Sequence, residues 1–283
     1  MRSAGRRSLA GGRLGRRVAS AAVLLALLGV ALWVEGPFLY VFLGVVVAVG
    51  LWELSGLLQQ IGAPPPPWVL YPLGLWLLYQ YVLPPEVPVL DWGLGLAVVA
   101  GLIGGLVMRP PQMVRWVAAV GGAVYIGLSI GFLVGVLRLT GSASHAYAHF
   151  GLRAVGVTLA SAFAGDTAAF FTGSAAGRHS FFPSISPNKT VEGALGGGLA
   201  TVLVWLIAAP LGFGLAWYHA LIVGMLVAVA SQGGDLVESS LKRAAGVKDS
   251  SSLIPGHGGL LDRMDSVVLL GPVVYCYLRL LGL

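Results

Sequence analysis

The chain has little charge and almost no cysteine. Only 10% of its 283 residues are charged, and Cys276 is the single cysteine. One cysteine excludes an intrachain disulfide framework and a cysteine-rich metal site. The low charge, together with 57% hydrophobic residues and a mean hydropathy of +0.87, excludes an ordinary soluble globule. The sequence therefore predicts an integral membrane protein.

Acidic residues are absent from the first 34 positions, whereas basic residues are frequent there. Six of the seventeen basic residues lie in this tail: Arg2, Arg6, Arg7, Arg13, Arg16 and Arg17. The net charge of +6 therefore indicates a tail that sets membrane orientation, and no nucleic-acid partner is expected. The apolar run 18–34 is followed by Glu35-Gly36-Pro37 and lacks a small-residue cleavage site, which favours a retained first helix over a signal peptide.

Apolar windows of about 17–22 residues, the length that crosses about 30 Å of hydrocarbon, recur along the whole chain. The windows are 18–34, 37–58, 68–83, 92–108, 116–137, 153–172, 194–213, 217–238 and 264–282. The breaks between them are rich in proline and glycine, as in the run Pro64 to Pro67. The 42 glycines suit helices that approach closely in a bilayer. We therefore expect an all-α, polytopic membrane protein with about nine transmembrane helices.

The basic residues also predict the orientation of these spans. With a cytoplasmic N-terminus, fourteen of the seventeen lysines and arginines lie on the cytoplasmic side, and only Arg138, Arg153 and Arg279 lie outside. This asymmetry is typical of membrane proteins in that orientation. Both long polar loops, 173–193 and 239–263, are then cytoplasmic.

The acidic residues divide the chain into two unequal parts. Seven of the eleven follow position 165: Asp166, Glu192, Asp235, Glu238, Asp249, Asp262 and Asp265. We expect a basic cytoplasmic tail at 1–17, transmembrane helices at 18–151 that form a scaffold and a possible dimer interface, and a catalytic transmembrane region at 152–283.

Two pairs of carboxylates flank the loop between the last two spans. Asp235 and Glu238 share one helix face, and Asp262 and Asp265 repeat this spacing at the start of the next span. Because one loop joins the two spans, Asp235, Asp262 and Asp265 can meet at the cytoplasmic interface. Close carboxylates repel one another unless a cation lies between them, and oxygen ligands without cysteine favour Mg²⁺.

Other interpretations of these acidic residues stay open. The carboxylates can instead pair with Lys242, Arg243 and Arg263. Asp166 lies inside the span 153–172, where an ionised carboxylate is disfavoured by roughly 2.5–3.5 kcal/mol. It is either a functional group or a protonated side chain used in helix packing.

The loop 180–198 combines hydroxyl groups, Lys189 and a glycine cluster before a helix. Backbone N–H groups at a helix start beside a lysine suit an anion, although the P-loop motif is absent. Ser186 and Thr190 can equally form a turn and a helix N-cap. An acidic site beside basic loops at headgroup depth indicates phosphoryl or nucleotidyl transfer on a lipid.

The stretch Ser239 to Asp265, with its pattern S-x-L-K-R-x-x-x-x-K-D-x-x-x-x-x-P-x-H-G-G-L-x-D-R-x-D, resembles the signature of phosphatidate cytidylyltransferases. The stretches Asp166 to Gly173 and Ser186 to Gly193 are similar to other recurring elements of that family, so the resemblance covers roughly 152–283. It implies a reaction of CTP with phosphatidate that gives CDP-diacylglycerol and pyrophosphate. It also implies Mg²⁺, a second monovalent cation such as K⁺, and a helical homodimer in the bilayer.

The resemblance also implies roles for particular residues, which we state as expectations. The catalytic group is Asp235, Lys242, Asp262, Arg263 and Asp265, with Asp235, Asp262 and Asp265 as metal ligands. The substrate-binding group is Asp166, Ser186, Asn188, Lys189, Thr190, Glu192, Arg243, Lys248, Asp249 and His257. Which basic residues bind the triphosphate and which bind the lipid phosphate stays open. We expect spans six to nine to form a lateral cleft for the acyl chains.

Two other functions remain as alternatives. A CTP-dependent lipid-alcohol kinase would transfer the γ-phosphoryl group from a similar site. An ion-coupled transporter would place its acidic residues near the middle of the bilayer and in both halves of the chain. The concentration of acidic residues at one interface favours an enzyme. We expect it in the inner membrane of a bacterium, with the active site facing the cytoplasm.

Overall fold

The computed structural model describes residues 20–82, 110–140 and 149–283, except the single positions 21, 25, 35, 255 and 257. The helices after the segment Ala22–Val34 are α2 (Gly36–Gln60), α3 (Pro67–Tyr79), α5 (Pro110–Gly122), the π-helix η1 (Ala123–Leu128), α6 (Ser129–Leu137), α7 (Phe150–Ala176), α8 (Val191–Phe213), α9 (Trp217–Ala244), α10 (Leu261–Met264) and α11 (Leu270–Leu280). Two short strands, β1 (Ser180–Phe182) and β2 (Ser186–Thr190), complete the described elements.

The described part of the chain is an all-α membrane protein, as the apolar windows predict. Five helices are long and apolar enough to cross a membrane: Gly36–Gln60, Gln112–Leu137, Phe150–Ala176, Val191–Pro210 and Trp217–Ala244. Ala22–Val34, α3 and α11 coincide with further predicted windows but are shorter. The window 92–108 lies outside the described residues, so the count of nine stays a prediction.

A β-hairpin between α7 and α8 is the one departure from the all-α prediction among the described residues. β1 and β2 pair antiparallel, with Ser180 opposite Thr190 and Phe182 opposite Ser186. Thr190 then caps α8, because its side-chain hydroxyl accepts a hydrogen bond from the Gly193 N–H at 3.1 Å. The hairpin is too short and too rich in proline to show a strand pattern in the sequence. It fixes the position of the residues just before α8.

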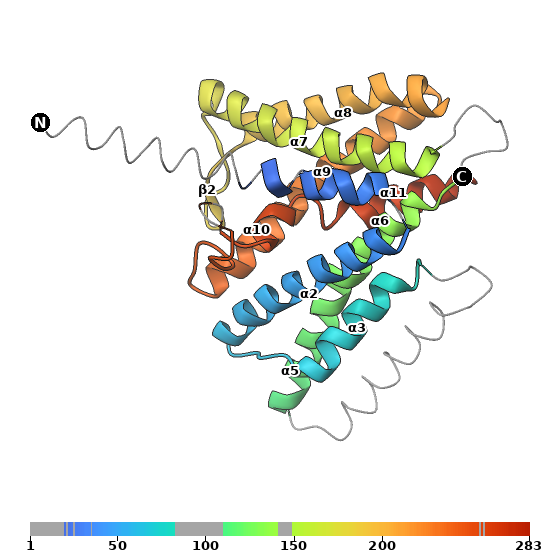
Figure 1. The fold of residues 1–283 in the computed structure, drawn as a ribbon. Coiled ribbons are helices and arrows are strands. Elements are labelled where there is room, and N and C mark those ends of the chain that lie inside the picture. The colour runs from blue at the N-terminus through green and yellow to red at the C-terminus, as the bar shows by residue number, and fades with distance from the viewer. Residues whose placement is uncertain are drawn as a thin grey trace, which may run out of the picture.

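The helices form two packed groups (Figure 1). One buried apolar cluster joins α2, α3 and the continuous helix α5–η1–α6, with Leu51, Leu70 and Ile126 among its members. A second cluster joins α7, α8, α9 and α11, with Trp205 among its members. Residues of α6 belong to both clusters, so the two halves of the chain share one interior.

Small residues bring α7 and α8 into close contact, as the glycine content predicts. A Cβ atom on Gly197 would lie 2.8 Å from the Gly165 carbonyl oxygen and 2.9 Å from the Ala169 Cβ atom. Such backbone proximity supports helix association in a bilayer, where burial of apolar surface gives little driving force. The two helices therefore form a rigid wall beside α9.

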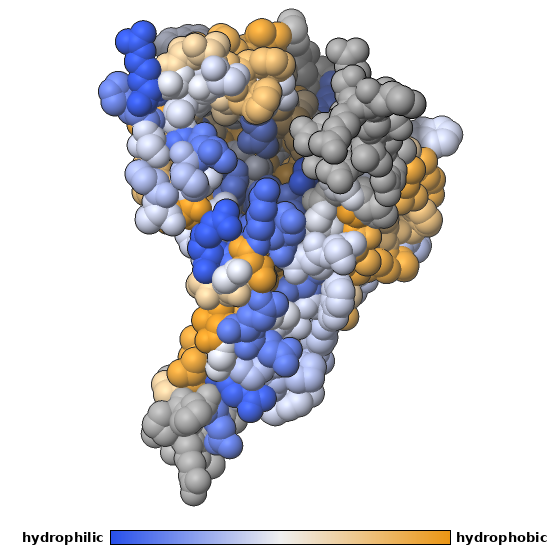
Figure 2. All heavy atoms as spheres, turned by 90° about the vertical axis from the view of Figure 1, so that its left-hand side faces the viewer, coloured by the Kyte–Doolittle hydropathy of each residue, from blue (hydrophilic) through white to orange (hydrophobic). Residues whose placement is uncertain are grey.

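The polar elements gather at one end of the bundle. The hairpin, the C-terminal end of α9, the loop 245–260 and α10 all lie on the left of Figure 1, whereas α6 ends and α7 begins on the right. Figure 2 views the left side and shows hydrophilic residues across it, with hydrophobic residues along the flanks. The polar loops therefore share one end of the helix bundle.

Candidate active site

The hairpin and α9 meet through an ion pair between residues that are far apart in the sequence. The Lys189 ammonium group donates a hydrogen bond to Asp235 Oδ2. Ser239, one turn further along α9, donates to Asp235 Oδ1 at 3.3 Å. Both partners of the ion pair are about 30% exposed at their side chains, which leaves them within reach of a ligand.

Asp265 lies against α9 because α9 has a glycine at the contact. A Cβ atom on Gly234 would collide with the Asp265 carbonyl oxygen. The Asp265 carboxylate accepts a hydrogen bond from the Ser266 N–H at 2.7 Å. Burial raises the pKa of Asp265 to about 7, and the negative charges of Asp235 and Asp166 add to this effect. The Asp265 carboxylate therefore interacts electrostatically with the charges of Asp166 and Asp235.

Lys242 forms a second, more buried cluster. Its ammonium group donates to Glu238 Oε1 at 2.9 Å and to Asp262 Oδ1 at 2.7 Å. Glu238 is fully buried, and Lys242 and Asp262 are 9% and 8% exposed. Breaking such a buried arrangement by removing one partner typically costs about 3–5 kcal/mol. Asp262 thus pairs with Lys242, as the alternative to metal binding predicts.

The remaining oxygen of Asp262 holds the loop that precedes it. Asp262 Oδ2 accepts hydrogen bonds from the Ser250 N–H at 2.8 Å, the Ser250 hydroxyl at 2.9 Å and the Gly259 N–H at 2.8 Å. Burial favours a higher pKa, but the hydrogen bonds from Lys242, Gly259 and Ser250 outweigh it and hold the pKa of Asp262 below its usual value. Asp262 is therefore an ionised residue that positions the loop.

Glu53, in the N-terminal half, holds the same loop from the other side. Its buried carboxylate accepts hydrogen bonds from the N–H groups of Leu260 and Leu261 at 2.9 and 2.6 Å. The hydroxyls of Ser250 and Ser251 donate to it at 3.2 and 2.6 Å. Sequence reasoning did not assign Glu53 to the site, although an acidic residue inside an apolar window was a usable signal.

The glycines of the loop allow these two carboxylates to approach the backbone. Gly258 adopts a φ of +85°, which favours glycine, and a Cβ atom there would lie 2.7 Å from Asp262 Oδ2. A Cβ atom on Gly259 would lie 2.6 Å from Glu53 Oε1. The two glycines therefore allow the loop backbone to lie directly against Glu53 and Asp262.

The other predicted residues take several positions around these clusters. Glu192 accepts hydrogen bonds from the N–H groups of Arg178 and His179 at 3.1 and 3.3 Å and pairs with the His179 ring at 2.6 Å. Arg243 donates to the carbonyl groups of Ile185 at 3.4 Å and Val247 at 3.2 Å, and so links the hairpin to the loop. Ser186 pairs within the hairpin, Asn188 is exposed, and His257 lies outside the described residues.

Lys248, Asp249 and Arg263 line a polar pocket of about 580 Å³ at this end of the molecule. Ser251, Ser252, Ile254, Gly256 and Gly258 complete its wall. Two basic residues beside hydroxyl and backbone groups suit a phosphate group. The loop 248–258 forms most of the pocket wall, and the same loop is hydrogen-bonded to Asp262 through Ser250.

The described residues contain no group of three or more histidine, cysteine, aspartate or glutamate side chains that could already hold a metal ion. Lysines lie instead at Asp235 and Asp262. The chemistry of the donor set still fits a hard cation, because the mutually repelling carboxylates Asp166, Asp235 and Asp265 offer only oxygen atoms. Asp262 fits less well than Asp235, because its side chain is more deeply buried and already accepts four hydrogen bonds, from Lys242, Ser250 and Gly259.

Comparisons of the sequence identify relatives among known proteins. The chain is 36% identical over 159 residues to a phosphatidate cytidylyltransferase of Bacillus subtilis, which is 56% of each chain. It is 44% identical over 110 residues to a phosphatidate cytidylyltransferase of Staphylococcus saprophyticus, covering 38% of this chain and 42% of that protein. It is also 43% identical over 114 residues to the uncharacterized protein YnbB of Escherichia coli, covering 40% and 38%.

These matches span between 38% and 56% of the length of the three relatives. The sequence profile of the cytidylyltransferase family, in contrast, matches residues 15–281 and thus includes the helix of Glu53 as well as the polar end of the bundle. The chain belongs to the cytidylyltransferase family.

Proposed function

We propose that the protein transfers a cytidylyl group from CTP to phosphatidate and releases pyrophosphate, in phospholipid biosynthesis. The observation that carries the proposal is the contact of Lys189 with Asp235, beside Asp265, at the polar end of a membrane bundle in a cytidylyltransferase. Two of the relatives described above are named for this reaction. Their shared regions are partial, so the activity and both substrates are proposals for this chain.

The reaction needs charge neutralisation more than proton removal. The second pKa of a phosphate monoester is about 6, so the lipid phosphate is mostly a dianion at neutral pH and attacks the α-phosphorus of CTP without a general base. The main barrier is the repulsion between two polyanions. Lys189 is positioned to bind the triphosphate, because it reaches from the hairpin to Asp235 at the polar end.

The carboxylates have a separate role in this proposal. Asp235 and Asp265 would hold Mg²⁺, with Asp166 beside them, and the ion would neutralise the departing pyrophosphate. Lys189 leaves Asp235 for the triphosphate when the nucleotide binds. Asp262, which the sequence predicted as a third metal ligand, is not a ligand in this proposal. Together with Lys242 it holds the loop 250–259 in place.

The membrane arrangement is part of the proposal. Nine spans, with the N-terminus and the active site on the cytoplasmic side of a bacterial inner membrane, give CTP direct access to the polar end. A homodimer and a second monovalent cation such as K⁺ remain part of the same proposal. The separation of the basic loops from Arg138 and Arg279, which follow α6 and end α11, supports the orientation.

A direct test measures pyrophosphate release by purified protein in mixed micelles that contain phosphatidate, CTP and Mg²⁺. Wild-type protein is expected to release pyrophosphate, whereas Asp235→Asn loses at least about 100-fold in kcat, as expected for the loss of a metal ligand. Release of CDP without pyrophosphate, in micelles that contain diacylglycerol in place of phosphatidate, would instead indicate the lipid kinase. No reaction, combined with ion-dependent solute uptake in vesicles, would favour the transporter.

A further inference from the structure

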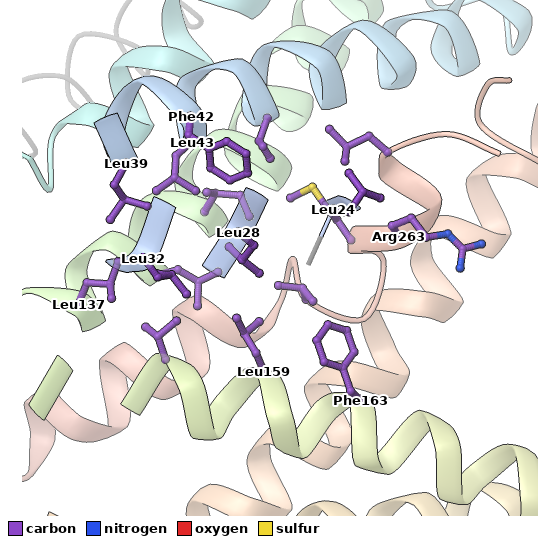
Figure 3. A pocket seen from close by; sticks show the side chains of 17 residues that line it. Leu24, Leu28, Leu32, Leu39, Phe42, Leu43, Leu137, Leu159, Phe163 and Arg263 are labelled. Carbon is purple, nitrogen blue, oxygen red and sulfur yellow. The ribbon is translucent and has the colours of Figure 1, made fainter. Parts of the chain in front are cut away.

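An apolar cavity of about 300 Å³ lies beside the polar site, between the two halves of the chain. Its walls come from the helical segment Ala22–Val34, α2, α6, α7 and the segment 260–267. Figure 3 shows Leu28, Leu43 and Leu159 around it. Among the 17 described residues that line the cavity, Arg263 alone is charged.

Arg263 joins this cavity to the polar pocket. It lines the apolar cavity with Met264 and also lines the polar pocket with Lys248. In Figure 3 its guanidinium group points away from the apolar side chains. The aliphatic stem of an arginine can cover apolar surface while its charged end lies among polar groups. The two pockets together are therefore complementary to an amphiphile with an anionic head.

The segment 260–267 places this junction beside the candidate active site. Leu260, Met264 and Val267 line the cavity, whereas Asp262 and Asp265 belong to the polar clusters. The spacing of the three apolar residues follows the helical period, so the cavity wall and the acidic residues are different sides of one short segment. A lipid headgroup bound at Arg263 would therefore lie near Asp265, which is only two positions further along the chain.

We propose that the cavity binds an acyl chain of phosphatidate while Arg263, with Lys248, binds the lipid phosphate. This inference rests on the proposed function and adds the position of the lipid. A volume of about 300 Å³ is at the lower end of ligand pockets, and about twice that of an engineered cavity that holds benzene, so it suits part of one chain. The planar guanidinium group matches a phosphate through paired hydrogen bonds.

The position of the cavity changes the expectation drawn from the sequence. We expected the lateral cleft between spans six to nine, but only α7 and the segment 260–267 come from that region. The helix Ala22–Val34, α2 and α6 provide the other walls. The N-terminal half therefore does more than support the fold, because it selects the acyl chain.

Adjacent valines on α2 provide a matched pair of variants. Val46 lines the cavity, whereas Val45 is 58% exposed and lies outside it. Val46→Phe narrows the cavity, and Val45→Phe adds the same group at an exposed position. Activity is measured with dioleoyl and dioctanoyl phosphatidate in mixed micelles at saturating CTP. We expect Val46→Phe to lower kcat/KM for the dioleoyl substrate about tenfold more than for the dioctanoyl substrate.

The control Val45→Phe is expected to keep the wild-type ratio between the two substrates. Val46→Leu, which adds less volume, is expected to change the ratio in the same direction as Val46→Phe and serves if that variant does not fold. Equal ratios in wild type, Val46→Leu and Val46→Phe would overturn the inference. An unchanged ratio with a changed oligomeric state in Val46→Phe would show that a second copy of the chain occupies the cavity, which also overturns it.

Arg263 is tested separately with Arg263→Gln. We expect KM for phosphatidate to rise about tenfold or more while KM for CTP stays the same, because the change removes a charge-assisted contact to only one substrate. An equal rise of both KM values would contradict the assignment of Arg263 to the lipid. If wild-type protein releases no pyrophosphate with either lipid, the proposed function fails, whereas an active wild type with unaltered variants refutes the inference alone.

Discussion

Glu53 holds the loop of the candidate site although it comes from a different half of the chain. We predict that Glu53→Gln lowers kcat by roughly tenfold and the free energy of unfolding by about 1–3 kcal/mol. An amide keeps the size of the side chain but replaces one acceptor oxygen with a donor, which then faces the N–H group of either Leu260 or Leu261. Steady-state kinetics and thermal unfolding in detergent provide the measurements.

Gln59→Ala, an exposed change on the same helix, is the control for Glu53→Gln and is expected to alter neither quantity. A positioning role predicts that kcat falls more than KM for CTP changes. If Glu53→Gln unfolded more easily but turned over at the wild-type rate, Glu53 would be a structural residue with no influence on the site.

The raised pKa of Asp265 is expected to make the stability of the folded protein depend on pH. Its pKa rises from 3.8 to about 7 on folding, so the neutral form is favoured in the folded protein. The unfolded chain loses this proton near pH 4 and the folded chain near pH 7. Metal-free protein is therefore expected to become less stable as the pH rises from about 4 to about 7.

Asp265→Asn removes this charge and is expected to unfold at a temperature roughly 2–4 °C above wild type at pH 8 in a chelating buffer. The difference between the two proteins should disappear near pH 4, where Asp265 is neutral in both states. A melting temperature for Asp265→Asn below that of wild type at pH 8 would show that the ionised carboxylate is stabilised in the folded state.

The residues of the site differ in how far the sequence could predict them. The acidic residues and lysines were identifiable, because charges at the edge of an apolar window require partners. Which partner each one takes was not, since Lys189 and Asp235 are 46 positions apart and meet only through the hairpin. The choice between a metal and Lys242 at Asp262 likewise depends on geometry that spacing alone does not fix.

At the scale of elements, α9 and the segment around Asp265 are in close backbone contact. Gly234→Ala places a methyl group against the Asp265 carbonyl oxygen. Because the backbone must shift, we predict an activity loss of about tenfold or more and a cost of about 1–3 kcal/mol in the free energy of unfolding. Turnover and denaturation of the purified variant check both values.

The neighbouring glycine offers a matched control. A Cβ atom on Gly233 would meet only the Leu269 Cδ1 atom, at 3.9 Å, which is an ordinary contact. Gly233→Ala is therefore expected to keep wild-type turnover. An equal loss of turnover in the two alanine variants would mean that any alanine in this part of α9 lowers activity. The contact of Gly234 with Asp265 would then not explain the loss.

The elements were predictable to different degrees. Long apolar runs identify α2, α7, α8 and α9 because a chain in lipid must satisfy its backbone hydrogen bonds within each helix. The hairpin was missed, since β1 and β2 have three and five residues and pack at the polar surface, where no such constraint applies. The short helix α10 was also missed, because three of its four residues fall in the predicted polar loop 239–263.

At the scale of the whole molecule, the described helices alternate between a polar end and an opposite end, as the distribution of basic residues predicts. We predict that a cysteine at Ser184, in the hairpin turn, reacts with a membrane-impermeant maleimide only from the cytoplasmic side. A cysteine at Thr140, which follows α6, is expected to react only from the other side. Both positions are exposed.

This labelling is measured in intact cells and in inverted vesicles of a Cys276→Ser background. Reaction of both cysteines from one side would refute the orientation, because the two ends would then face the same compartment. The orientation therefore stays a prediction from the sequence until the labelling tests it. The cavity could not be predicted from the sequence, because it depends on how helices from both halves pack together.

The central claim is that the polar end of the bundle transfers a cytidylyl group to a phosphate held at the membrane surface. The most direct measurement follows label from α-³²P-CTP and γ-³²P-CTP into the lipid product of purified protein with phosphatidate and Mg²⁺. The account predicts that the α-label enters the lipid and the γ-label leaves as pyrophosphate. Entry of the γ-label into the lipid, with the α-label left in CDP, would contradict it.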